Sequence, residues 1–148
     1  MKKVLSFIMF LVLFVSLTGC INADRPTIEE DGFRIRAISN LYFDNDINAI
    51  SLRVRFENTT TEVQEVDASN FSVVVGSLNA STSDIRIVTG NRLTTTSSEI
   101  RLTLTVDPGT TVEIYMRVRN AGNDILSYNP NTVTALIRYN GTAIFTRS

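Results

Sequence analysis

The sequence contains no histidine, no tryptophan and a single cysteine, Cys20. One cysteine cannot form an internal disulfide, and a zinc site built from cysteine and histidine ligands is excluded with it. Catalysis by a nucleophile paired with histidine is excluded as well. Because no motif for phosphate binding or paired acid–base chemistry takes its place, we expect no enzyme and assign no catalytic residue.

The chain opens with a short apolar segment after two positive charges. Lys2 and Lys3 precede a stretch from Val4 to Leu17 whose only polar residues are Ser6 and Ser16. This stretch is shorter than the roughly 20 residues that a membrane-spanning helix needs. Its length and its positive start are typical of a cleaved secretory signal, so we predict a signal peptide over residues 1–19.

The signal ends in Leu17-Thr18-Gly19-Cys20, which resembles the lipobox of bacterial lipoproteins. The resemblance implies cleavage before Cys20, a diacylglycerol on its thiol and acylation of the new amine. It implies that the chain is held on the extracytoplasmic face of the cell membrane. In a diderm host it implies the outer membrane, since Ile21 stands where lipoproteins retained at the inner membrane carry an aspartate. An uncleaved anchor with a chance cysteine is the alternative.

Cleavage would change the charge of the chain. Of its 14 cationic residues the signal removes Lys2 and Lys3, which leaves 12 arginines against 15 acids and a formal charge of −3. Residues 20–31 are polar, contain Pro26 and end in acids, so we expect a lipidated tether there. The domain proper is expected over residues 32–148.

From Gly32 onward, apolar and polar residues alternate with a period of two, which is typical of half-buried β-strands. We expect eight short strands, over residues 33–38, 50–57, 71–75, 85–87, 100–106, 112–119, 133–139 and 142–146. Asp107-Pro108-Gly109 and Asn140-Gly141 are strong turn signals. Only residues 61–68 suit a helical turn. The pattern predicts an all-β chain, an antiparallel β-sandwich of about seven or eight strands.

Three segments resemble strands of immunoglobulin-like domains in bacterial envelope lipoproteins. They are Leu52–Asn58, where an apolar alternation ends in asparagine, Asp67–Gly76, and Val106-Asp107-Pro108-Gly109 with the strand up to Val118. The resemblance covers roughly residues 32–140 and implies an immunoglobulin-like sandwich. Such domains have proposed roles in protein contact, and the resemblance implies no activity.

Asp44, Asp46 and Asn48 have the spacing that opens a calcium-binding loop. An EF-hand is excluded because Ala49 and Arg55 stand where its glycine and glutamate would be. A looser Ca²⁺ site with Asp44 and Asp46 as ligands is one interpretation, and an ordinary turn is the other. We expect no other cofactor.

The motif Arg-x-Arg occurs three times, at Arg34/Arg36, Arg53/Arg55 and Arg117/Arg119. A spacing of two places both guanidinium groups on one strand face, opposite the core. In an immunoglobulin-like fold the first two strands and the strand of Arg101 share a sheet. This predicts a cationic patch that could contact an anionic partner, made of Arg34, Arg36, Arg53, Arg55 and Arg101. Ordinary solvent-facing arginine, neutralised by nearby glutamates, is the alternative.

The inward face of the expected strands predicts a core that includes Leu52, Val54, Phe56, Leu102, Leu104, Ile114 and Met116. Taken together, the sequence favours a lipid-anchored, non-catalytic module. It would be held to the membrane through Cys20 and contact an envelope protein or an anionic envelope polymer, with no nucleic-acid partner. The alternative is a lipoprotein that binds a small ligand or an ion for a membrane partner; a deep polar pocket would favour it.

Overall fold

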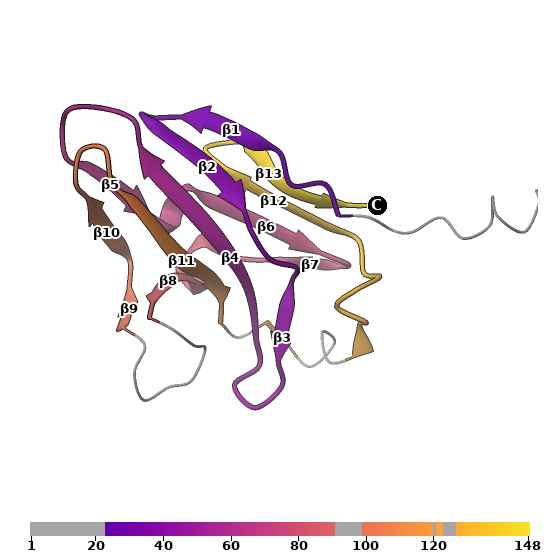
Figure 1. The fold of residues 1–148 in the computed structure, drawn as a ribbon. Helices are drawn as coiled ribbons and strands as arrows, with labels where there is room; N and C mark the ends of the chain where they lie inside the picture. Colours follow the sequence, from indigo (N-terminus) through magenta and orange to yellow (C-terminus); the bar gives the residue numbers. More distant parts are fainter. Residues whose placement is uncertain (1–22, 91–98, 120, 123–126) are drawn as a thin grey trace, which may run out of the picture.

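The computed structural model describes residues 23–90, 99–119, 121–122 and 127–148, and their arrangement is shown in Figure 1. The largest sheet has seven strands in the order β1-β2-β4-β11-β8-β9, with β3 also paired to β4. Its strands are β1 (Thr27–Glu30), β2 (Phe33–Ala37), β3 (Tyr42–Asp44), β4 (Ala49–Asn58), β8 (Ile85–Thr89), β9 (Glu99–Arg101) and β11 (Thr111–Val118).

A second sheet of four strands has the order β13-β12-β6-β7, and β10 and β5 form a separate pair. All pairings are antiparallel. These elements are β5 (Gln64–Asp67), β6 (Phe71–Val75), β7 (Leu78–Asn79), β10 (Thr103–Val106), β12 (Ala135–Tyr139) and β13 (Thr142–Arg147), with the 3-10 turns η1 (Ala68–Asn70) and η2 (Thr82–Asp84). The predicted all-β antiparallel sandwich is confirmed, although the described residues form thirteen strands instead of seven or eight. No helix in the described part of the chain is long and apolar enough to cross a membrane.

The core lies between the two larger sheets, which Figure 1 shows as two layers, with β4 crossing in front of β6. At its centre is the ring of Phe56, on β4. Its centroid lies 5.4 Å from that of Phe33, 6.1 Å from that of Phe71 and 5.1 Å from that of Tyr139, all edge to face. Since Phe71 and Tyr139 belong to the second sheet, this cluster joins the two layers. Five predicted core residues are fully buried: Leu52, Val54, Phe56, Ile114 and Met116.

Two predicted core residues lie elsewhere. Leu102 is 58% exposed, and Leu104 is only partly buried. The expected single strand over residues 100–106 is interrupted at Leu102, because β9 pairs with β8 in the large sheet while β10 pairs with β5. The backbone oxygen of Leu102 accepts a hydrogen bond from Ala68 N (2.8 Å) at this crossing. The burial prediction for Leu102 was therefore wrong.

The sandwich begins before residue 32, inside the segment expected to be a tether. Strand β1 pairs with β2, and Asp24 forms a β-bridge with Thr146. Asp31 (φ 48°) and Gly32 (φ 77°) form the turn between β1 and β2, and Asp-Gly with two positive φ angles suits a tight hairpin. Glu29 and Glu30 therefore belong to the edge strand β1, and Ile28 of this strand packs against the core.

The segment expected to hold a helical turn, residues 61–68, contains a strand. Strand β5 covers Gln64–Asp67, and only the short turn η1 follows it. The carboxylate of Asp67 accepts a hydrogen bond from Ser69 N (2.7 Å), which caps η1. Val66 is fully buried, so burial of one face decided the conformation of this segment.

Asn58 ends β4 and holds the adjoining loops together, although it is only 1% exposed. Its Nδ2 donates to the backbone oxygens of Glu62 (2.8 Å) and Val106 (2.9 Å). Its Oδ1 accepts from Thr60 N (2.9 Å) and Thr60 Oγ1 (2.8 Å). The asparagine at the end of the apolar alternation thus satisfies backbone groups of two segments, the loop after β4 and the end of β10.

We expect Asn58→Ala to lower the free energy of unfolding by about 2–3 kcal/mol, because it leaves buried partners without a hydrogen bond. Urea denaturation of both proteins measures the difference. Asn129→Ala is a suitable control, since that asparagine also caps a turn, through Asn131 N, at an exposed site. A loss no larger than the control's would show that loop packing, and not the Asn58 amide, holds this corner.

Candidate anion-contact site

Four of the five arginines of the predicted patch come together on the outer face of β2 and β4. Residue Arg36 lies opposite Arg55, and Arg34 lies opposite Glu57. The residues between them in sequence, such as Ile35 and Val54, are buried on the opposite face. The alternation therefore turns the arginines outward, as predicted. We call Arg34, Arg36, Arg53 and Arg55 the arginine array.

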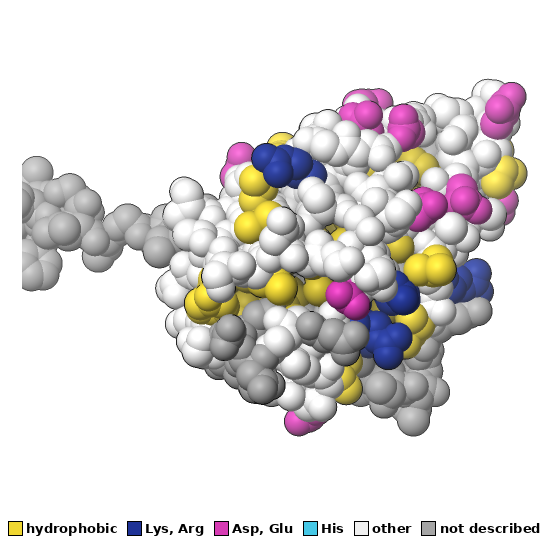
Figure 2. All heavy atoms as spheres, turned by 180° about the vertical axis from the view of Figure 1, so that it is seen from behind, with side chains coloured by type: hydrophobic (Ala, Val, Ile, Leu, Met, Phe, Trp, Pro, Cys, Tyr) yellow, Lys and Arg dark blue, Asp and Glu magenta, His cyan; other side chains and the backbone are white. Residues whose placement is uncertain are grey.

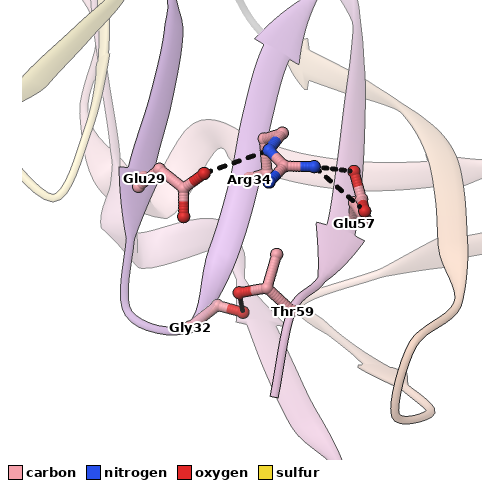
Figure 3. A network of polar contacts seen from close by, with 5 residues as sticks. All are labelled: Glu29, Gly32, Arg34, Glu57 and Thr59. Carbon is pink, nitrogen blue, oxygen red and sulfur yellow. Dashed lines mark hydrogen bonds and ion pairs between the residues drawn. The ribbon is translucent and has the colours of Figure 1, made fainter.

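Arg34 bridges two strands by ion pairs, as Figure 3 shows. Its Nε lies 3.0 Å from Glu29 Oε1 on β1, and its Nη1 lies 3.0 Å from Glu57 Oε2 on β4. The hydrogen bond to Glu29, followed by the charge of Glu57, raises the pKa of Arg34. Nearby, Thr59 Oγ1 donates to Gly32 O (3.0 Å), as Figure 3 shows, and Thr59 N donates to the same oxygen (2.9 Å), which fixes the β1–β2 turn to the end of β4.

Arg53 and Arg55 share one carboxylate on β11. Arg55 Nη2 lies 2.6 Å from Glu113 Oε1, and Arg53 Nη2 pairs with Glu113 Oε2. The hydrogen bond from Arg55 is the main reason why the pKa of Glu113 is lowered. Three of the four arginines are therefore neutralised in part, and the array with Glu29, Glu57 and Glu113 has a formal charge of +1.

Arg36 is the exception within the array. It is exposed, and among the described residues it forms neither a hydrogen bond nor an ion pair. It lies on a surface hollow of about 170 Å³ whose walls are Thr27, Arg34, Arg36, Arg55 and Glu57. Three guanidinium groups with one acid around a hollow of this size suit one carboxylate or phosphoryl group, whether it is free or carried by a longer chain.

The fifth predicted arginine, Arg101, does not join the array. It lies on β9, in the same sheet but separated from β4 by β11 and β8. The third Arg-x-Arg pair differs too, because Arg117 is only 2% exposed and burial lowers its pKa. Its Nε donates to Ser51 Oγ at 3.4 Å. The prediction that the five form one patch was therefore wrong for Arg101.

The predicted calcium ligands are Asp44, which ends β3, and Asp46, in the turn that leads to β4. Asp44 Oδ1 accepts hydrogen bonds from the backbone nitrogens of Asp46 (3.1 Å) and Ile47 (3.4 Å). The charge of Asp44 also acts on Arg117, and a cation there would compete with a metal ion. In the described ranges, no three side chains of the His, Cys, Asp and Glu types are grouped so that they could hold a metal.

Sequence reasoning missed two of the acids that pair with the array. Glu29 was not predicted because residues 20–31 were expected to form a tether. The Asp31-Gly32 turn is the signal that could have indicated the hairpin of β1 and β2. Glu113 escaped because its position opposite Arg55 depends on the register of β4 and β11, which no short turn connects. Cys20 lies outside the described residues.

The chain was compared with protein-family models, with curated proteins and with solved structures, and none of them matches it.

Proposed function

We propose that this chain is a lipid-anchored, extracytoplasmic β-sandwich module that is not an enzyme and contacts an anionic envelope polymer. The lipobox of residues 17–20 supports the anchor. The filled core supports a contact module over a ligand carrier, and two hollows on the surface of the described residues, of about 170 and 240 Å³, are smaller than typical ligand pockets of roughly 300–1,000 Å³.

The observation that carries the polymer contact is the arginine array, and Arg36 in particular. A cation without an acidic partner among the described residues is free to pair with an anionic group from outside. Arginine forks suit carboxylate and phosphoryl oxygens, which repeat along anionic polymers. Figure 2 shows the molecule from behind, where basic side chains lie in small separate groups with acidic ones between them.

The test is binding of the full chain, in micelles of an uncharged detergent, to polyphosphate and to polyglutamate across a salt series. We expect binding that weakens as salt rises, because exposed charges are screened. Arg36→Ala should weaken it by up to about fivefold, since an exposed ion pair contributes about 0.2–1 kcal/mol.

Arg138→Ala is the matched control, because Arg138 lies on β12 in the other sheet. Equal losses in Arg36→Ala and in the control, or no binding at low salt, would contradict the polymer contact. If only an acidic envelope protein binds and the polymers do not, the array serves a protein partner instead.

A further inference from the structure

Two arginines meet at the end of the sandwich where the described chain begins. The bridge between Asp24 and Thr146 places Arg25, before β1, beside Arg147 at the end of β13. Figure 1 shows the start of the described chain and the C-terminus at this same end. Both guanidinium groups reach one neutral acceptor: Arg25 Nη2 donates to Asn40 Oδ1, and Arg147 Nη2 lies 3.4 Å from the same atom.

Arg147 is a buried cation, only 4% exposed. Its Cζ lies 5.3 Å from the centre of the Phe145 ring, and its Nη1 donates to Pro130 O. Neither Arg25 nor Arg147 forms an ion pair within the described residues. Burial, and then the charge of Arg25, lowers the pKa of Arg147, as expected for a buried cation next to a second cation.

The hydrogen-bonding capacity of this pair is only partly used. The Nε atoms of Arg25 and Arg147 are both buried, and neither has a hydrogen-bond acceptor within the described part of the chain. Buried cations are rare unless they are paired, and buried donors are nearly always satisfied. An amide oxygen shared by two cations is a weak acceptor, and an anionic oxygen would form shorter and stronger charge-assisted bonds.

The surface hollow of about 240 Å³ near this end lies on the outer face of the second sheet, where Val74 and Leu136 point, whereas Arg147 is paired with Ala135 on the inner face. The ligand is therefore inferred from the cations alone, and two guanidinium groups suit the oxygens of one phosphoryl group. Arg25 also lies five residues after Cys20, a distance of at most about 18 Å along an extended chain.

We propose that Arg25, Asn40 and Arg147 form a binding site for the phosphoryl group of a membrane phospholipid. The source of the ligand rests on the proposed function, because the lipid on Cys20 would bring this end of the sandwich to the membrane surface. The phosphoryl oxygens replace Asn40 Oδ1 as the acceptor for both guanidinium groups.

The test uses the full chain in micelles of an uncharged detergent and follows the Nε–H signals of Arg25 and Arg147 by ¹H–¹⁵N NMR. The probes are dihexanoyl phosphatidylglycerol, dihexanoylglycerol, which lacks the phosphoryl group, and inorganic phosphate. We expect a saturable shift of both signals with the phospholipid and none with dihexanoylglycerol. Arg25→Gln should weaken binding about tenfold, because it removes a hydrogen bond between charged groups.

Arg138→Gln is the control and should bind like the wild type. The proposal is overturned if the phospholipid leaves both signals unmoved, if dihexanoylglycerol moves them equally, or if Arg25→Gln has no effect. Binding of inorganic phosphate as tight as that of the phospholipid would overturn the lipid source while the anion site stands.

The intact mass of the same sample separates this proposal from the proposed function. Lipid binding by a chain without acyl groups on Cys20 would contradict the proposed lipid anchor and would still support the phosphoryl site. An acylated chain whose arginine signals do not respond would sink the site alone.

Discussion

Phe56→Ala should lower the free energy of unfolding by about 3–5 kcal/mol, a large share of the roughly 5–15 kcal/mol that stabilises a typical domain. The ring is completely buried and contacts rings from both sheets, at centroid distances of 5.4 Å to Phe33 and 5.1 Å to Tyr139. Its removal opens a cavity where the layers meet, which costs the transfer free energy of the ring and the lost contacts of its neighbours. No internal disulfide can offset the loss, since the chain has one cysteine.

Chemical denaturation followed by circular dichroism measures this effect, and Leu102→Ala is the matched control. Leu102 is also a large apolar residue on a predicted inward face, but it is 58% exposed. Its truncation should change stability by no more than about 0.5 kcal/mol. Equal losses in the two variants would mean that residues 99–106 pack against the core in solution and that the crossing at Leu102 is misplaced.

The contrast between Phe56 and Leu102 shows what a period of two can predict. In β4 and β11 the alternation identified the buried face correctly, because each strand has a paired neighbour on both sides and one face against the core. The residues from Ile100 to Val106 alternate just as regularly, but they pass from one sheet to another at the edge. Alternation shows which residues share a face, and pairing partners far along the chain decide where that face points.

The net charge of the candidate site was harder to predict than the positions of its arginines. The spacing within β2 and β4 was enough to place Arg34, Arg36 and Arg55 on one surface. Which of them keeps a free charge depends on Glu29 and Glu113, and these reach the array through strand pairings that the sequence does not display. The meeting of Arg25 and Arg147, 122 positions apart, had no signal in the sequence at all.

Cys20→Ala should abolish acylation and cleavage completely, because the thiol is the only group in residues 17–20 that can carry the lipid. The fold should remain intact, since the first described contact with the sandwich is made by Ala23, three residues further on, which packs against the core. We therefore expect an unchanged melting temperature beside a total loss of lipid. With the two or more acyl chains that the lipobox predicts, the wild type should enter the detergent phase, whereas one chain alone binds a membrane only marginally.

Intact mass is the decisive measurement for Cys20→Ala, because membrane association alone is ambiguous. If residues 1–19 stay attached, the apolar stretch from Val4 to Leu17 would hold the variant on the membrane even without a lipid. We expect the wild type to begin at Cys20 with added acyl mass, and the variant to keep residues 1–19 with none. Ser16→Ala is the control and should be processed like the wild type, because it alters the signal and leaves the thiol. A wild type that keeps residues 1–19 and carries no acyl group would show that the apolar stretch itself is the anchor and that Cys20 stands there by chance.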